Sequence, residues 1–324
     1  MADPRPSAAD AHAQEEPRSE SAVTVLVALV ANGLIAAAKT VAALLTGSAS
    51  MVAESAHSWA DTGNEVFLFL ATKRAGRKPD ESHPLGYGRD AYVWSMIAAF
   101  GLFAVGAAVS IMHGVQELLD PEPSGGFLVA YIVLAISLVL EGISFAQAFR
   151  QARGEAAERE KDLFSFVLQT SDPTVRAVFL EDAAALTGIG IAFLGILGHE
   201  LTGSPVPDAL GSILVGVLLG VVAIVLIQRN RRFLVGEEVD PVIRSAALTS
   251  LLERPAISAV TYLHLEYVGP ARVFLVAAVD LEGNESERDV AVLLNQLERD
   301  IERNPRVVRA VLTLSAPEHA PLTP

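Results

Sequence analysis

Four polar side chains recur along one short stretch of the chain: Glu54, His57, Asp61 and Asn64. Positions three and four residues apart share one face of an α-helix, so the imidazole of His57 and the carboxylate of Asp61 are expected one turn apart. An imidazole nitrogen and a carboxylate oxygen both suit zinc, and carboxylates with water suit manganese. The stretch is therefore a candidate half of a divalent-metal site. The plain alternative is that the four groups only line a polar seam between helices.

The residues around this stretch are apolar enough to lie in a membrane. The chain has 324 residues, of which 51% are hydrophobic and 19% are charged. Six segments are long enough to span a hydrocarbon layer of roughly 30 Å, which takes about 20 residues. Their predicted bounds are Ala22–Thr46, Ser48–Ala71, Ala91–Leu118, Phe127–Phe149, Val175–His199 and Ala209–Ile227. The fold class predicted is a polytopic α-helical membrane protein with six transmembrane helices, in which an intramembrane ionisable residue is a functional candidate by default.

Lysine and arginine occupy alternate loops of this predicted helical domain, residues 22–232. They cluster between segments 2 and 3, between segments 4 and 5, and after segment 6, and the intervening loops contain none. Positive charge marks the cytoplasmic side, so both termini are expected there. Residues 1–21 are polar and rich in Ala, Pro and acids, without a secretory signal, and are predicted to be a disordered cytoplasmic tail. The absence of a transit peptide and of cysteine fits a bacterial inner (plasma) membrane.

Composition also excludes several classes of function. The chain has no cysteine, so a metal site must use His, carboxylate, Asn or backbone ligands. A pI near 4.9 and the lack of a basic stripe argue against nucleic acid as a partner. The motifs H-E-x-x-H and G-x-S-x-G and a nucleotide-binding loop are all missing, so an enzyme is not expected.

A change of character near residue 233 predicts a second domain over residues 233–316, followed by a loose tail over 317–324. Asp240 and Pro241 are a typical helix start, and Gly269-Pro270 is a typical turn between two strands. The predicted order is helix, strand, strand, helix, strand, at Pro241 to Leu252, Val260 to Val268, Arg272 to Leu281, from Ser286, and Arg306 to Leu314. This order predicts a small cytoplasmic α+β domain with its helices on one face of the sheet.

Three stretches together resemble one known family, the cation diffusion facilitators. They are S-A-S-M-V-A-E-S-A-H-S-W-A-D-T-G-N at 48–64, H-P-L-G-Y-G-R-D at 83–90 and P-D-A-L-G-S-I-L-V-G at 207–216. A following L-V-G-E-E-V-D-P at 234–241 is similar to the start of the family's C-terminal ferredoxin-like domain. The resemblance implies a homodimeric metal-ion/proton antiporter in a lipid bilayer, with His57 and Asp61 as metal ligands.

The fifth predicted helix departs from the family pattern, which usually places H-x-x-x-D there. This chain has V-F-L-E-D-A-A-A-L-T-G and resembles a subgroup with L-E-D, including zinc-transporter-9-like proteins. Glu181 and Asp182 are the only candidate ligands in this helix, and they point about 100° apart. We favour Asp182 as the ligand, with Glu181 facing a neighbouring helix or taking protons. Glu54 and Asn64 are expected to support the site or to line its vestibule.

The function expected from these residues is divalent metal efflux, as Zn²⁺/H⁺ antiport by alternating access. The cation is a transported substrate rather than a permanently bound cofactor. Zinc is the first expectation because His57 is present, and the oxygen-rich set leaves Mn²⁺, Fe²⁺ and Co²⁺ open. The alternative is a non-transporting, metal-responsive scaffold or sensor with a degenerate site.

Overall fold

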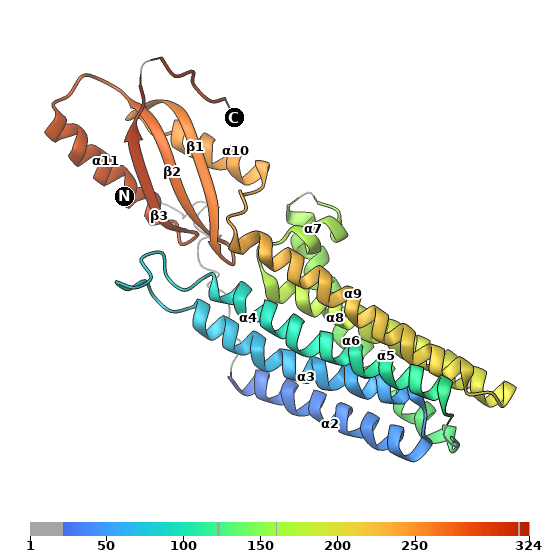
Figure 1. Ribbon diagram of the computed structural model, residues 1–324. Helices are drawn as coiled ribbons and strands as arrows, with labels where there is room; N and C mark the ends of the chain where they lie inside the picture. Colours follow the sequence, from blue (N-terminus) through green and yellow to red (C-terminus); the bar gives the residue numbers. More distant parts are fainter. Residues whose placement is uncertain (1–21, 122–123, 160, 317, 324) are drawn as a thin grey trace, which may run out of the picture.

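The computed structural model describes residues 22–121, 124–159, 161–316 and 318–323, so the predicted tail over residues 1–21 lies outside the described residues. A bundle of long helices forms one part of the molecule, and a small domain of strands and helices is joined to one end of it (Figure 1). The predicted class, a helical membrane protein with a small C-terminal α+β domain, is confirmed.

The helical bundle contains every predicted apolar segment. Its long helices are α2 (Ala22–Thr46), α3 (Ala49–Ala75), the continuous run of α4 (Asp90–Ala98), η1 (Ala99–Phe103) and α5 (Ala104–Leu119), α6 (Phe127–Glu158), α8 (Pro173–Thr202) and α9 (Val206–Leu234). Among the described residues, all of these except α3 are long and apolar enough to cross a membrane. Helix α3 packs against α2, α4, α5, α8 and α9, so its polar residues face other helices rather than only lipid.

Several helices extend beyond their predicted ends, because polar residues continue the helix past the apolar segment. Helix α6, for example, runs to Glu158 instead of Phe149. A short helix, α7 (Leu163–Gln169), was not predicted. Asp162 starts it by accepting hydrogen bonds from the backbone N–H groups of Phe164 and Ser165. The side-chain hydroxyl of Ser165, together with these backbone bonds, holds the pKa of Asp162 below its usual range.

The C-terminal domain has the predicted order: α10 (Pro241–Leu252), β1 (Ile257–Gly269), β2 (Arg272–Leu281), α11 (Glu287–Glu302) and β3 (Val307–Leu314). Strand β2 lies between β1, which is antiparallel to it, and β3, which is parallel. Both helices share one hydrophobic core with the sheet, so they cover the same face. The turn after Gly269 uses Ala271 in the left-handed region (φ 53°). Beyond the sheet, the N–H of Leu322 donates to the carbonyl of Val260 at 2.7 Å.

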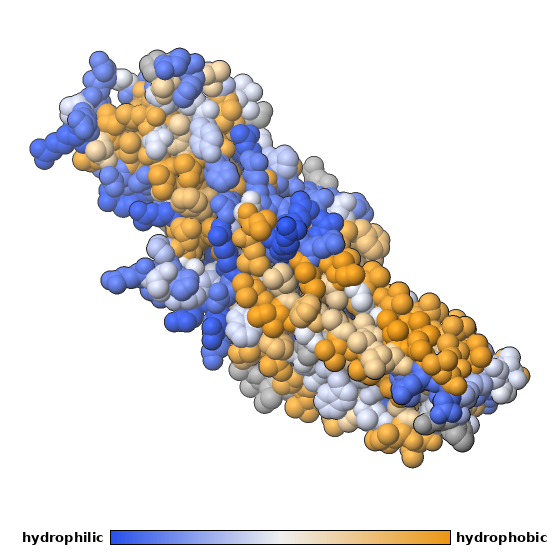
Figure 2. Space-filling view, viewed as in Figure 1, coloured by the Kyte–Doolittle hydropathy of each residue, from blue (hydrophilic) through white to orange (hydrophobic). Residues whose placement is uncertain are grey.

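The two parts meet through a small, well-packed contact. The ring of Tyr92 stacks on Phe233 with centroids 5.0 Å apart, and Phe233 meets Tyr267 of β1 edge-on at 5.6 Å. Next to them the backbones of Gly88 and Gly269 approach so closely that a Cβ on Gly88 would stand 2.4 Å from the carbonyl of Val268. The bundle is largely hydrophobic on the face shown in Figure 2, and hydrophilic side chains gather near its junction with the C-terminal domain.

Candidate metal site

His57 and Asp61 lie one turn apart on α3, as their spacing predicts. The Nε2 atom of His57 is 3.4 Å from Oδ2 of Asp61, and the two side chains are 1% and 19% exposed. Neither imidazole nitrogen has a hydrogen-bond partner among the described residues, and Oδ1 of Asp61 also lacks one. Burying polar atoms without partners costs free energy, so this pair is suited to binding a cation that supplies the missing contacts.

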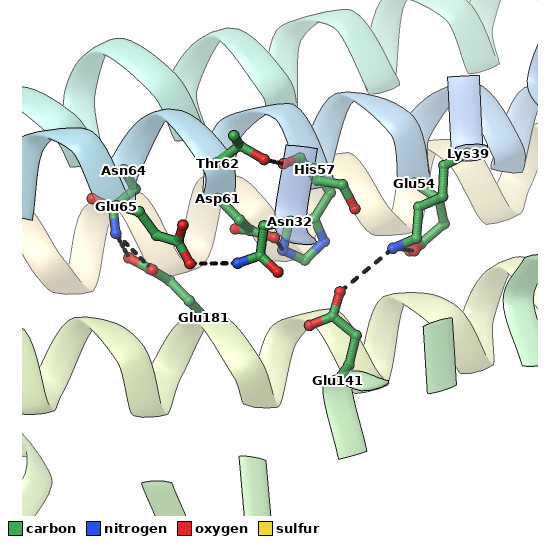
Figure 3. Close-up of polar contacts among 11 residues, drawn as sticks. Asn32, Lys39, Glu54, His57, Asp61, Thr62, Asn64, Glu65, Glu141 and Glu181 are labelled. Atoms are coloured by element: carbon green, nitrogen blue, oxygen red, sulfur yellow. Dashed lines mark hydrogen bonds and ion pairs between the residues drawn. The ribbon is translucent and has the colours of Figure 1, made fainter. Parts of the chain in front are cut away.

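Helix α8 places Glu181 and Asp182 in different surroundings. The buried Glu181 carboxylate accepts hydrogen bonds from Nδ2 of Asn64 on α3, at 2.7 Å to each oxygen (Figure 3). The Asp182 carboxylate accepts from Oγ of Ser144 on α6, at 2.9 Å. Glu181 is therefore the α8 carboxylate that faces the helix of His57 and Asp61.

A cavity of about 560 Å³ is lined by three of these groups, Asp61, Glu181 and Asp182, and not by His57. It lies between α2, α3, α6 and α8. The acidic side chains on its wall are Asp61, Glu65, Glu141, Glu181 and Asp182. Within the described part of the chain no three His, Asp or Glu side chains already converge as a preformed metal site. A cation bound by both helices would need Glu181 to turn from Asn64 toward Asp61.

An ion-paired lysine lies beside the pair, on its far side from Glu181. Nζ of Lys39 on α2 is 3.0 Å from Oε2 of Glu54 and 3.8 Å from Oε1 of Glu141 (Figure 3). Glu54 therefore contacts Lys39 through one oxygen, and among the described residues no hydrogen bond joins it to the imidazole of His57.

Glu65, which was not predicted as a site residue, lines the cavity and accepts a hydrogen bond from Asn32 of α2. The signal was available, because residue 65 follows Asp61 by four positions and so continues the same helical stripe. Ser144, the partner of Asp182, was also missed, and nothing in the local sequence marks it.

The fold and the site together define a class of protein. A bundle of long apolar helices with buried acids and an imidazole around an internal cavity is typical of proteins that move cations across membranes. Residues 25–235 match the family model of the cation efflux transmembrane domain. The chain belongs to this family, the cation diffusion facilitators, which are transporters rather than enzymes.

Individual relatives agree with the family assignment. The chain is 38% identical over 280 residues to "Proton-coupled zinc antiporter SLC30A9, mitochondrial" of Xenopus laevis, covering 84% of this chain and 50% of the relative. It is 38% identical over 260 residues to the human protein of the same name, covering 80% of this chain and 46% of the relative. It is 35% identical over 265 residues to "Metal tolerance protein C4" of Arabidopsis thaliana, covering 82% and 58%. The chain thus spans about half the length of these curated relatives.

Proposed function

We propose that this protein carries a divalent metal cation, zinc in the first place, across a membrane in exchange for protons. The observation that carries the proposal is the buried His57–Asp61 pair, whose unpartnered donor atoms lie beside a cavity that Glu181 also lines. Two relatives are named proton-coupled zinc antiporters, which supports zinc and proton coupling.

The site proposed consists of His57, Asp61 and Glu181. Glu181 takes the place that the sequence analysis favoured for Asp182, because Glu181 faces α3 and Asp182 faces α6. Asp182 then lines the cavity wall along the path by which the cation reaches the site. Asn64 holds the Glu181 carboxylate until the cation binds. One imidazole nitrogen with carboxylate oxygens suits zinc and also accepts manganese, iron or cobalt.

Proton exchange follows from competition for the same atoms. A neutral imidazole binds a metal ion, whereas an imidazolium does not, and a carboxylate that takes a proton loses a ligand lone pair and its charge. Metal release on one side and proton uptake by the emptied ligands are therefore coupled. Alternating exposure of one site to the two sides turns this competition into antiport.

The packing supports access from the end that carries the C-terminal domain. The cavity contacts α8 at Val178, Glu181 and Asp182, near the start of that helix. At the opposite end the buried Asp208 carboxylate of α9 accepts from the backbone N–H groups of Ala49 and Ser50, at 2.9 and 3.1 Å. These bonds tie the start of α3 to α9 and close that end.

The membrane, the orientation and the assembly belong to the same proposal. Alternate loops rich in Lys and Arg support a cytoplasmic location for both termini and the C-terminal domain. A bacterial inner membrane and a homodimer are proposed from the sequence and from the family resemblance.

A metal-responsive sensor that does not transport is the second candidate. It is favoured by one observation, that in the described residues no three ligands converge without a rearrangement. It predicts metal binding without flux.

Uptake of Zn²⁺ and Mn²⁺ into proteoliposomes under an imposed pH gradient tests both candidates. We expect saturable zinc uptake that depends on the gradient and is abolished in Asp61→Ala. The matched control is His319→Ala, which changes an exposed histidine beyond the last strand of the C-terminal domain. Binding without uptake at any pH would replace the antiporter by the sensor.

A further inference from the structure

Lys39 is a buried cation in the membrane-spanning bundle that the transport proposal does not use. Its side chain is 1% exposed and is held by Glu54 and by Glu141. Replacing a buried ion pair by apolar residues of similar volume is often neutral for stability. Stability alone therefore does not explain why a lysine stands here, and its position beside the cation site suggests a role in binding.

Glu54 has a second oxygen that Lys39 does not occupy. The side chain is 0% exposed, and its Oε1 atom has no hydrogen-bond partner among the described residues. A Cβ placed on Gly188 of α8 would stand 2.5 Å from this oxygen and 3.6 Å from Nδ1 of His57. The free oxygen and the imidazole nitrogen therefore approach the same point on α8.

We propose that Lys39 determines the cation preference of the site by withholding Glu54 from it. The inference rests on the proposed function and names the residue that tunes its substrate. While the ammonium holds Oε2, the Glu54 charge is compensated, and the side chain stays on the Lys39 side of α3. The site then presents one imidazole with Asp61 and Glu181, whose two negative charges match a divalent cation.

Without Lys39 the balance of donors changes. Glu54 then carries an uncompensated negative charge one helical turn from His57, and a bound cation attracts its carboxylate toward the site. Each added carboxylate makes the site harder and more oxygen-rich, which favours Mn²⁺ over Zn²⁺ by ligand softness. Lys39 is therefore expected to maintain the preference of the site for Zn²⁺ over Mn²⁺.

Two double variants form a matched test. Lys39→Gln with Glu141→Gln and Lys39→Gln with Glu54→Gln each remove one positive and one negative charge, so their net charge equals that of the native chain. They differ only in which carboxylate remains. In the first variant Glu54 is released, and in the second it is gone.

Zn²⁺ and Mn²⁺ affinities of the full-length chain in lipid nanodiscs provide the readout, with metal ions alone as the probes. We expect the Lys39/Glu141 double variant to shift the Mn²⁺-to-Zn²⁺ affinity ratio toward manganese by at least about tenfold, because it adds an oxygen donor. We expect the Lys39/Glu54 double variant to keep the native ratio. Equal ratios in the two variants would overturn the inference, as would a shift in the Lys39/Glu54 variant.

The single variant Lys39→Gln should show the same manganese shift as the Lys39/Glu141 variant. If it does not fold, the two charge-balanced variants still decide the question. Native zinc binding that is lost in Asp61→Ala separates the two proposals. If that loss is seen and the matched variants behave alike, only the role of Lys39 fails. If native zinc binding does not depend on Asp61, the proposed site fails, and the inference fails with it.

Discussion

At the scale of single residues, the main decision is which α8 carboxylate reaches the cation. Adjacent residues on a helix point about 100° apart, so Glu181 and Asp182 cannot face α3 equally. The structure turns Glu181 toward Asn64 of α3 and Asp182 toward Ser144 of α6. This geometry reverses the order of preference that we drew from the sequence, and the ligand roles remain a prediction.

Replacing Glu181 by Gln is expected to weaken zinc binding by at least about tenfold, or roughly 1.4 kcal/mol, because it removes a charged ligand. Asp182→Asn, the neighbouring change of the same chemical kind, is expected to have a smaller effect on affinity. Calorimetric titration of zinc into both variants measures this. A larger loss in Asp182→Asn would return the ligand role to Asp182.

Asp240 makes a pH-dependent contribution to the stability of the C-terminal domain. Burial by itself would raise the pKa of Asp240, but hydrogen bonds from Lys161 and from the N–H of Val242 outweigh it and hold the pKa below its ordinary value. A carboxylate with a lowered pKa stabilises the fold above the ordinary value of about 3.9 and loses that contribution as the pH falls through the folded-state pKa.

We therefore expect Asp240→Asn to unfold at a lower temperature than the native chain at pH 7. The difference should shrink below about pH 4, where the unfolded chain takes up a proton first, and should be lost as the pH falls through the lower folded-state pKa. Thermal unfolding followed by circular dichroism at pH 7 and pH 3 gives both values. A difference that is unchanged at pH 3 would show that the ionised carboxylate is not the source of the effect.

At the scale of elements, the bundle depends on close approach of helix backbones. Gly114 of α5 faces α9, and a Cβ there would stand 2.7 Å from the carbonyl oxygen of Ala209 and 2.7 Å from Cγ1 of Ile213. Small residues at such crossings let membrane helices pack without a gap. The contact between α5 and α9 is thus fixed by the absence of a side chain.

Gly114→Ala is expected to destabilise the bundle by about 1–3 kcal/mol, because the added methyl group forces α5 and α9 apart. Gly142→Ala in α6 is the control, since a Cβ at Gly142 would meet no atom within 4 Å. Thermal unfolding in detergent should show a lower midpoint for Gly114→Ala only. Equal unfolding midpoints in the two variants would mean that α5 and α9 accommodate the added methyl group without loss of stability.

At the scale of the whole molecule, the C-terminal domain is attached to the bundle through α4 and α9. Gly88, in the turn just before α4, meets Gly269 at the end of β1, and the adjacent Arg89 forms an ion pair with Glu266 of β1. Tyr92 and Phe233 add an aromatic stack across the same junction. We therefore expect a rearrangement of the bundle to be transmitted to the domain through this contact.

Gly88→Ala is expected to loosen this junction, because the new Cβ would overlap the backbone of Val268 and Gly269. Hydrogen exchange should become faster over residues 265–270, and proton-driven zinc uptake should fall. Gly154→Ala is the control, since nothing lies within 4 Å of a Cβ at that position. Unchanged exchange with lost uptake would show that Gly88 acts on the bundle alone.

Much of this architecture could be predicted from the sequence, because hydropathy and helical period are local properties. They identified the apolar segments, the stripe of Glu54, His57 and Asp61, and the order of elements in the C-terminal domain. Short sequence motifs also predicted the family, which the family model confirms. Helix ends were less predictable, because polar residues extend helices past their apolar parts.

The tertiary structure alone decided how distant segments meet. The rotation of α8 selects Glu181 to face α3, and the crossing of α2 and α3 brings Lys39 to Glu54. These pairings depend on helix packing across the bundle, which no local pattern encodes. The sequence by itself therefore determined the class of the protein and the spacing of His57 and Asp61 on one helix face, and only packing decided which charges share the cavity.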